Sequence, residues 1–256
     1  MWSYGAAVSP DGTRIVASGV VASTGQTVGK VRWSGGDEVW HPIPVPRGNV
    51  MGVAFDPAGE RVAVGLSLRS RRGDGYHWRS YLCVCRLDPV EIGKPFVVYP
   101  APIVVAFDRT GTRVACTGGI DGEPEVVVHD AATGELAFEF KPKGTQSRGL
   151  SFDAAGRLAV VNAKWVYVLP PDGGKPQFVL EATKQMNAGV FSPDGRRILT
   201  GDHAGALRVW DSADGSPVKS FDWQIGPVTA VAFAPDGLTC AAAGTNGRVV
   251  LWDVDE

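Results

Sequence analysis

Short apolar runs separated by turn residues make up most of this chain. The run Val228–Phe233 has the length and alternation of a half-buried strand, and it ends directly before the turn residues Pro235, Asp236 and Gly237. Similar runs recur along the whole chain, and no stretch keeps the period of an amphipathic helix over several turns. The pattern predicts an all-β protein.

These runs belong to an internal repeat. Its anchor residue ends the first apolar run of each copy, and successive anchors are separated by 39 to 52 residues. A period of about 40–45 residues is typical of four-stranded propeller blades. The anchors are Val8, Phe55, Phe107, Phe152, Phe191 and Phe233.

Each copy contains the same sequence of elements. A Pro-Asp-Gly turn or a variant of it follows the anchor, because Pro presets φ, Asp caps the turn and Gly adopts positive φ. The second strand often opens with arginine, a third strand follows, and a fourth closes most copies. We expect these fourth strands near residues 38–45, 95–99, 135–140, 176–181 and 217–222.

The third strands carry the family signature. They end in Trp210-Asp211 and Trp252-Asp253, with weaker versions at His129-Asp130 and Leu87-Asp88. Together with the turns, these residues resemble the WD-40 repeat β-propeller family over nearly the whole chain. The resemblance implies one domain over 1–256 with six four-stranded WD-like blades, the last lacking its outer strand. The blades are expected at about 1–46, 47–100, 101–145, 146–184, 185–226 and 227–256.

One family feature is missing throughout. The Gly-His pair that precedes the first strand in the family has no counterpart here, and Gly226-Pro227 stands nearest to it. The resemblance therefore implies that the buried His–Asp hydrogen-bond network is lost and that the blades depend more on packing.

The end of the last copy leaves an edge without a partner. The apolar third strand Val249–Trp252 has no fourth strand after it, and unpaired edges favour association. Three explanations stay open: the chain is a piece of a longer protein, the first and last blades close by face packing, or a partner adds the strand, either another protein or a second copy.

Composition and charge restrict the function classes. A hydrophobic fraction of 44% and a net charge of −2 exclude disorder, and no basic excess indicates a nucleic-acid partner. No segment has the apolar length of a membrane span, and the N-terminus does not resemble a secretory signal. We expect a cytoplasmic protein that binds neither nucleic acid nor membrane, with its four cysteines buried and reduced.

The segment between the second and third strands of the second copy is the main candidate for binding. It runs from Leu66 to Tyr81 as an irregular insertion with a basic and aromatic tip, residue types enriched at interface hot spots. One interpretation is an arm for an acidic peptide, protein or phosphate, and the other is a long β-hairpin with a solvated basic tip. The candidate residues are Arg69, Arg71, Arg72, Tyr76, His77, Trp78 and Arg79.

Polar residues at or just before the first strands form a second candidate set. By resemblance they lie near a channel mouth, where they would bind peptide backbone or satisfy buried backbone groups. They are Asn49, Arg148, Asn187 and Gln224.

The predicted function is a non-catalytic scaffold that docks proteins or peptides, acidic ones included, on the upper face of the propeller. The four histidines have no metal-ligand spacing and no Gly-x-Ser-x-Gly elbow occurs, so we expect no cofactor, no metal and no catalytic residue. The alternatives are an enzyme or sensor propeller of hydrolase or lactonase-like type, and a regulatory module of a larger protein.

Overall fold

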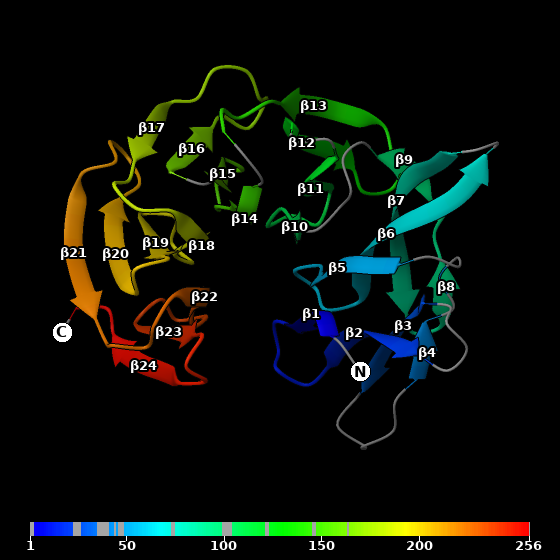
Figure 1. The fold of residues 1–256 in the computed structure, drawn as a ribbon, viewed down its shortest axis with the longest axis horizontal. Helices are drawn as coiled ribbons and strands as arrows, with labels where there is room; N and C mark the ends of the chain where they lie inside the picture. Colours follow the sequence, from blue (N-terminus) through cyan, green and yellow to red (C-terminus); the bar gives the residue numbers. More distant parts are fainter. Residues whose placement is uncertain are drawn as a thin grey trace. The chain divides into compact units, whose positions relative to one another are not determined.

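The computed structural model describes the chain at residues 3–22, 27–34, 41–43, 45, 49–72, 75–98, 104–120, 123–144, 147–162 and 164–255. Over these residues the secondary structure is entirely β, without helices (Figure 1). The strands form antiparallel sheets that follow one another along the chain, as in the blades of a WD-repeat propeller.

The chain divides into two compact units. The first holds residues 1–121 and 125–139, and the second holds 122–124 and 140–256. The sheets follow one another in chain order within each unit, and the two units are described in turn. The single-domain organisation and the blade boundaries expected from the repeat stay predictions.

The first unit carries three sheets. The first has the order β1 (Ser3–Val8), β2 (Ile15–Ala22), β3 (Thr27–Ser34), β4 (His41–Ile43). The second contains β5 (Asn49–Phe55), β6 (Arg61–Arg72), β7 (Gly75–Leu87), β8 (Val90–Ile92) and β9 (Phe96–Val98). The third has the order β10 (Val104–Phe107), β11 (Arg113–Ile120), β12 (Glu123–Asp130), β13 (Leu136–Phe140).

The second unit carries the remaining sheets. They have the orders β14 (Ser147–Phe152), β15 (Leu158–Asn162), β16 (Trp165–Leu169), β17 (Phe178–Glu181), and β18 (Met186–Phe191), β19 (Arg197–Asp202), β20 (Ala206–Asp211), β21 (Pro217–Asp222). The last sheet has three strands in the described part: β22 (Val228–Phe233), β23 (Thr239–Gly244) and β24 (Val249–Asp253). This agrees with the missing outer strand that the sequence predicted.

The outer strand expected near residues 95–99 is present as β9, and the structure adds a second short strand, β8, that the sequence did not predict. Both strands pair with β7. Gly93 lies between them and donates its N–H to Val84 O at 3.0 Å. A Cβ at residue 93 would lie 2.2 Å from that oxygen, so only glycine allows this approach.

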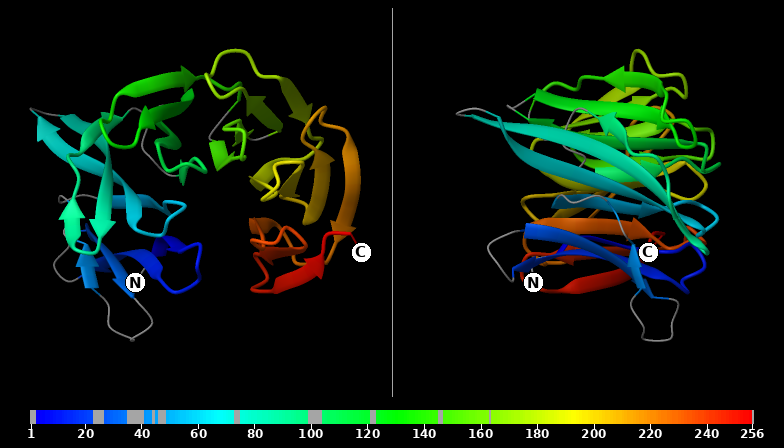
Figure 2. Two further views of the ribbon diagram at one scale, coloured as in Figure 1. Left: turned by 180° about the vertical axis from the view of Figure 1, so that it is seen from behind. Right: turned by 90° about the vertical axis from the view of Figure 1, so that its right-hand side faces the viewer.

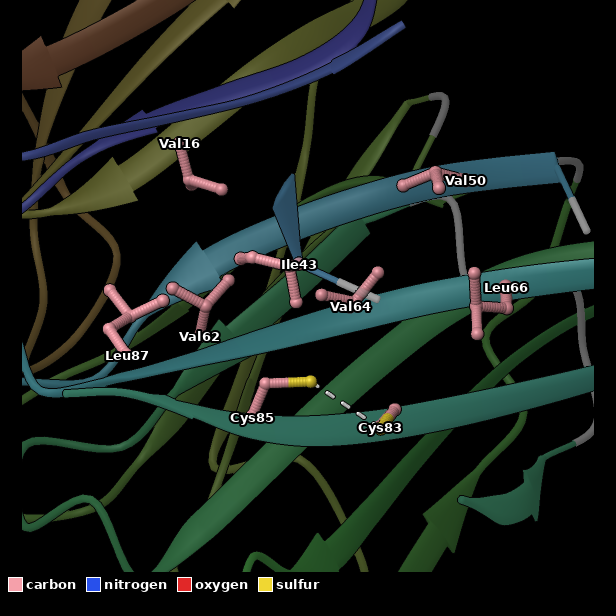
Figure 3. Close-up of a cluster of buried hydrophobic side chains, with 9 residues drawn as sticks. All are labelled: Val16, Ile43, Val50, Val62, Val64, Leu66, Cys83, Cys85 and Leu87. Carbon is pink, nitrogen blue, oxygen red and sulfur yellow. Dashed lines mark hydrogen bonds between the residues drawn. The ribbon is translucent and has the colours of Figure 1, made fainter. Parts of the chain in front are cut away.

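Apolar side chains fill the space between successive sheets within each unit. Figure 3 shows the cluster between the first and second sheets, where Val16 and Ile43 meet Val62, Val64 and Leu66. Further clusters join the second sheet to the third, the fourth to the fifth and the fifth to the last. Packing between sheets is therefore the main source of the buried area in both units.

The four cysteines are buried and unpaired by disulfides, as expected. Cys83 and Cys85 lie on the same face of β7 with their sulfur atoms 3.6 Å apart (Figure 3). The hydrogen bond with Cys83 and burial raise the pKa of the Cys85 thiol. Burial raises the pKa of Cys240 to about 11, so this thiol is protonated at neutral pH and is a poor nucleophile.

The repeat turns join neighbouring sheets through arginine. The turn glycine of every copy has positive φ, between 71° and 81°, as the turn chemistry predicted. Asp56 accepts a hydrogen bond from Arg61 Nε at 2.8 Å, and Arg61 Nη2 donates to the turn carbonyl of Gly111 in the next sheet. In the second unit Arg157 bonds Asp153 and Gly195 O in the same way.

Candidate interaction surface

The longest hairpin of the described chain is formed by β6 and β7. Their ladder runs without interruption from Arg61↔Arg86 to Arg72↔Gly75. The described residues of 66–81 are therefore not irregular but continue the two strands, in agreement with the long β-hairpin that was one of the two interpretations of this segment. A projecting segment needs partners for its backbone N–H and C=O groups, and the hairpin ladder supplies them.

The end of this hairpin extends beyond the other strands of its sheet (Figure 1 and Figure 2). The pairing of β5 with β6 stops at Asn49↔Ser67, and the pairing of β9 with β7 stops at Ser80↔Val98. From Leu68↔Arg79 outward, the described strands pair only with each other. We call residues 68–79 the hairpin arm.

The burial pattern separates the arm from the core. Residues 62–67 of β6 are buried, Leu68 is half-buried, and Arg79 at the base of the arm is exposed. The side chains of Arg69, Arg71, Arg72, Tyr76, His77 and Trp78 lie outside the described residues, and only their backbone register is given. That register sets Arg69 opposite Trp78 and Arg71 opposite Tyr76, so cross-strand pairs combine a cation with an aromatic residue.

Asn49 is the one predicted first-strand residue that shares a sheet with the arm. It is half-buried and lies opposite Ser67, one ladder position from the base of the arm. The structure thus brings Asn49 close to the hairpin in the first unit.

The other predicted polar residues belong to the second unit. Arg148 and Asn187 occupy the same register position, a β-bulge in the first strand of their sheets. Arg148 is exposed, whereas Asn187 Nδ2 donates to Val228 O of the next sheet at 3.0 Å. Asn187 therefore hydrogen-bonds a backbone carbonyl of its own chain, which is one of the two roles that the sequence left open for these polar residues.

Gln224 lies apart from those two, in the connection between β21 and β22. Its φ of 52° is the positive value of a non-glycine residue, and its carbonyl accepts a hydrogen bond from Asn246 Nδ2 at 3.1 Å. Its side chain is exposed and available to a partner.

Sequence reasoning missed one cavity in the first unit. It has a volume of about 230 Å³ and lies between the outer part of the second sheet and the turn after β12. Arg86, Lys94 and Glu91 are among its polar lining, and Phe96 and Ala131 are among its apolar lining. No motif in the sequence indicates it, because these residues come from separate copies of the repeat.

No metal or membrane feature emerges among the described residues. They contain no group of three or more His, Cys, Asp or Glu side chains arranged to hold a metal ion. Nor do they contain a helix of the length and apolar character that crossing a membrane requires.

His129 is a buried histidine of the first unit. Its Nδ1 lies 3.0 Å from Gly134 O, its ring packs against Phe96, and burial lowers its pKa.

The family model for the WD domain, G-beta repeat, matches residues 174–211 and 215–253. Two segments of the chain therefore match WD repeats. The first match covers β17 to β20 and the second covers β21 to β24. They end at Trp210-Asp211 and Trp252-Asp253, the residues that carried the resemblance in the sequence. The WD repeats here are thus recognisable both by pattern and by sheet topology.

Curated relatives of the chain include proteins that are named for WD repeats. The chain is 34% identical over 92 residues to pre-mRNA-processing factor 19 of rice, which covers 35% of this chain and 17% of the relative. It is 28% identical over 161 residues to mouse WD repeat and HMG-box DNA-binding protein 1, 59% of this chain and 13% of the relative. An uncharacterized WD repeat-containing protein of Synechocystis is 28% identical over 118 residues, 44% of this chain and 33% of the relative. The chain therefore spans a third or less of each relative.

Proposed function

We propose that this protein is a non-catalytic WD-repeat scaffold that docks protein or peptide partners, and that the hairpin arm is its principal contact. The observation that carries the proposal is the arm itself, a paired hairpin that extends past its sheet and has four arginines in its sequence. Arginine and aromatic residues are enriched where interfaces concentrate their binding energy.

The chemistry of the arm favours acidic partners. Its residues 68–79 contain Arg69, Arg71, Arg72 and Arg79 against the single acid Asp74. A carboxylate-rich peptide would pair with the guanidinium groups bidentately, and the aromatic residues would add apolar area. Asn49 at the base of the arm supplies an amide for peptide backbone. A cytoplasmic location and binding through Arg148, Asn187 and Gln224 remain parts of this proposal.

The test replaces Arg69, Arg71 and Arg72 together with glutamate. Partner capture by the wild type and the variant, read by mass spectrometry side by side, is expected to lose its acidic partners in the variant. Thermal unfolding followed by circular dichroism should change little, because the three residues lie on the arm, beyond the point where β5 stops pairing with β6.

Two control variants make the result specific. Replacing the same three arginines with lysine keeps the charge and removes the planar fork, so binding should be weakened but retained. Arg196→Glu changes an exposed arginine in the second unit, 86% accessible, and should leave capture unchanged. Equal capture by the glutamate variant and the wild type would refute the role of the arm.

A further inference from the structure

The cavity of the first unit lies where the second sheet meets the third. Its volume is about 230 Å³, below the roughly 300 Å³ of the smallest drug-sized pockets. The short strands β8 and β9, which both pair with β7 (Figure 1), border it on one side, and the turn after β12 borders it on the other. The space therefore suits one side chain or one small acid rather than a large cofactor.

Arg61 of the cavity wall has a close counterpart in the second unit. Arg61 donates to Asp56 through Nε and to Gly111 O of the third sheet through Nη2. Arg157 makes the same two bonds, to its own turn aspartate and to the turn carbonyl of the fifth sheet. Arg157 also donates from Nη1 to Ser212 O at 2.8 Å and from Nη2 to Ser212 Oγ at 3.0 Å. In the second unit one residue thus supplies two oxygen atoms to the guanidinium group.

Ala131 takes the place of Ser212 beside Arg61. Each follows the aspartate that ends a third strand, and each donates its N–H to the carbonyl just before the arginine that opens the second strand of its sheet, at 2.8 and 2.9 Å. Alanine has no hydroxyl. Among the described residues, the side-chain hydrogen bonds of Arg61 use Nε and Nη2, and Nη1 has no acceptor. The Arg61 side chain is 30% exposed, against 18% for its counterpart, so the cavity wall contains a guanidinium group with unused donors.

The ionisable side chains around the cavity leave one positive charge unbalanced. Arg86 pairs with Glu91 at 4.0 Å, and Arg61 pairs with Asp56 at 2.8 Å. Lys94 is exposed and has no ion pair in the part of the chain that the structure describes. A single carboxylate balances this charge, whereas a phosphate monoester, with a charge of about −1.5 to −2 at neutral pH, exceeds it.

Apolar groups form another part of the cavity wall. Phe96 is half-buried with its ring against His129, and Ile92 is 39% exposed. Val84 of β7 also lines the cavity. Removing such surface from water is favourable, so a ligand with an apolar body gains affinity here in addition to its charge.

We propose that this cavity binds a carboxylate that is attached to an apolar group. The two carboxylate oxygens accept hydrogen bonds from the unused donors of Arg61, as the two oxygens of Ser212 do in the second unit. Lys94 adds its charge, and the apolar group packs against Phe96. Such a ligand is either a free carboxylic acid or the C-terminal residue of a protein. The cavity and the hairpin arm share no residue, so the two proposals are independent.

The test uses 3-phenylpropionate as the probe, with neutral 3-phenylpropanamide and doubly charged phenyl phosphate for comparison. Titration into the isotope-labelled whole chain should shift the amide resonances of Gly93, Ala131 and Ala132, which line the cavity, in a saturable way. The acid should bind about tenfold more tightly than the amide, because only the acid forms charge-assisted hydrogen bonds, and it should also bind more tightly than the phosphate.

Two further ligands distinguish the sources of the carboxylate. The peptide GSGSF with a free C-terminus presents the same carboxylate and phenyl ring at the end of a chain, and its C-terminal amide is the control. Tighter binding of the free peptide than of 3-phenylpropionate would assign the site to a protein C-terminus. The opposite order would assign it to a small acid.

Two variants test the roles of the residues. Ala131→Ser gives Arg61 the hydroxyl that its counterpart has in the second unit, so it should weaken 3-phenylpropionate about two- to tenfold, the value of one competing hydrogen bond. Lys94→Gln should weaken the acid about two- to fivefold, whereas Lys175→Gln, at an exposed lysine of the second unit, should have no effect. The triple Arg-to-Glu variant of the hairpin arm should bind the acid normally, which separates failure of the cavity from failure of the arm.

Four results would overturn the inference. They are equal affinities for the acid and the amide, tighter binding of the phosphate than of the acid, no saturable shift at Gly93 or Ala131, and unchanged affinity in both Ala131→Ser and Lys94→Gln. Thermal unfolding of the two variants shows that each is folded before its affinity is compared.

Discussion

The fifth sheet and the last sheet have the same repeat sequence in outline, but they are held together differently. In the fifth sheet Trp210 Nε1 donates to Thr200 Oγ1 at 2.9 Å, and Asp202 pairs with Arg208 at 2.7 Å. Asp202 is only 1% exposed, and its other oxygen caps the N–H groups of Ala204 and Ala206. This sheet therefore has a polar network around a buried aspartate.

The last sheet replaces each of these polar groups with an apolar one. Ala242 occupies the position of Thr200, Gly244 that of Asp202 and Val250 that of Arg208. Trp252 keeps the tryptophan, but its buried Nε1 has no hydrogen-bond partner. The last sheet therefore depends on packing against the fifth, where Leu207 and Val209 meet Trp252.

This difference revises the expectation drawn from the absent Gly-His pair. The sequence predicted that every blade lacking the histidine would lose the network around its buried aspartate and depend more on packing. In the fifth sheet Arg208 substitutes as the partner of Asp202, because an arginine two residues before the tryptophan reaches across the strand pair. Of these two sheets, it is the last that follows the expectation.

The largest expected effect is the removal of the tryptophan from the polar network of the fifth sheet. Trp210→Ala should lower the free energy of unfolding by about 3 kcal/mol, because it empties a packed aromatic site and leaves Thr200 Oγ1 without its donor. Trp252→Ala should cost a similar amount through packing alone. Urea unfolding followed by circular dichroism measures both, and a loss below about 1 kcal/mol for Trp210→Ala would contradict the packing of Trp210 seen here.

A smaller effect is expected from giving the last sheet the missing acceptor. Ala242→Thr places a hydroxyl where Thr200 stands in the fifth sheet, and Ala242→Val adds the same volume without it. The threonine variant should be more stable than the valine variant by about 1 kcal/mol, the net value of one hydrogen bond. Equal stability of the two variants would mean that Trp252 Nε1 is oriented away from residue 242.

The smallest expected effect concerns pH. In the fifth sheet the hydroxyl of Ser192 and then the N–H of Arg196 hold the pKa of Asp194 below its usual range. A depressed pKa in the folded state adds stability above the unfolded pKa of about 4, and this stability is lost as the pH falls through the folded value. The last sheet has Ala234 where the fifth has Ser192.

Ser192→Ala should therefore destabilise the protein more at pH 7 than at pH 2. Because Asp194 is largely exposed, solvent screening limits this difference to about 0.5 kcal/mol or less. The loss of the hydroxyl bond to Arg197 N contributes equally at both pH values. A destabilisation that is larger at pH 2 would reverse the assigned sign.

Local sequence determined the strands and turns of this protein. Alternating apolar runs and Pro-Asp-Gly turns predicted the order of the strands, the glycines with positive φ and the three strands of the last sheet. These features depend on residues close together in the chain, whose side-chain period and turn chemistry act before any distant contact forms.

The candidate site was predicted in composition but not in structure. The sequence identified Arg69 to Arg79 as a basic, aromatic segment and left a long β-hairpin open as one interpretation, but it did not determine that the two strands pair without interruption as far as Arg72↔Gly75. Residues such as Leu68 and Tyr76 favour a strand only when a partner strand is present. The same limit explains why β8, next to Gly93, was missed.

The sequence by itself determined which segments become strands and where each repeat turns. Only the tertiary structure decided which hydrogen-bond partner each polar side chain meets: Arg61 and Arg157 reach the turn carbonyl of the next sheet, and Arg208 meets Asp202. The physical reason is that a side chain's local period fixes its face, whereas its hydrogen-bond partner lies on another strand or another sheet.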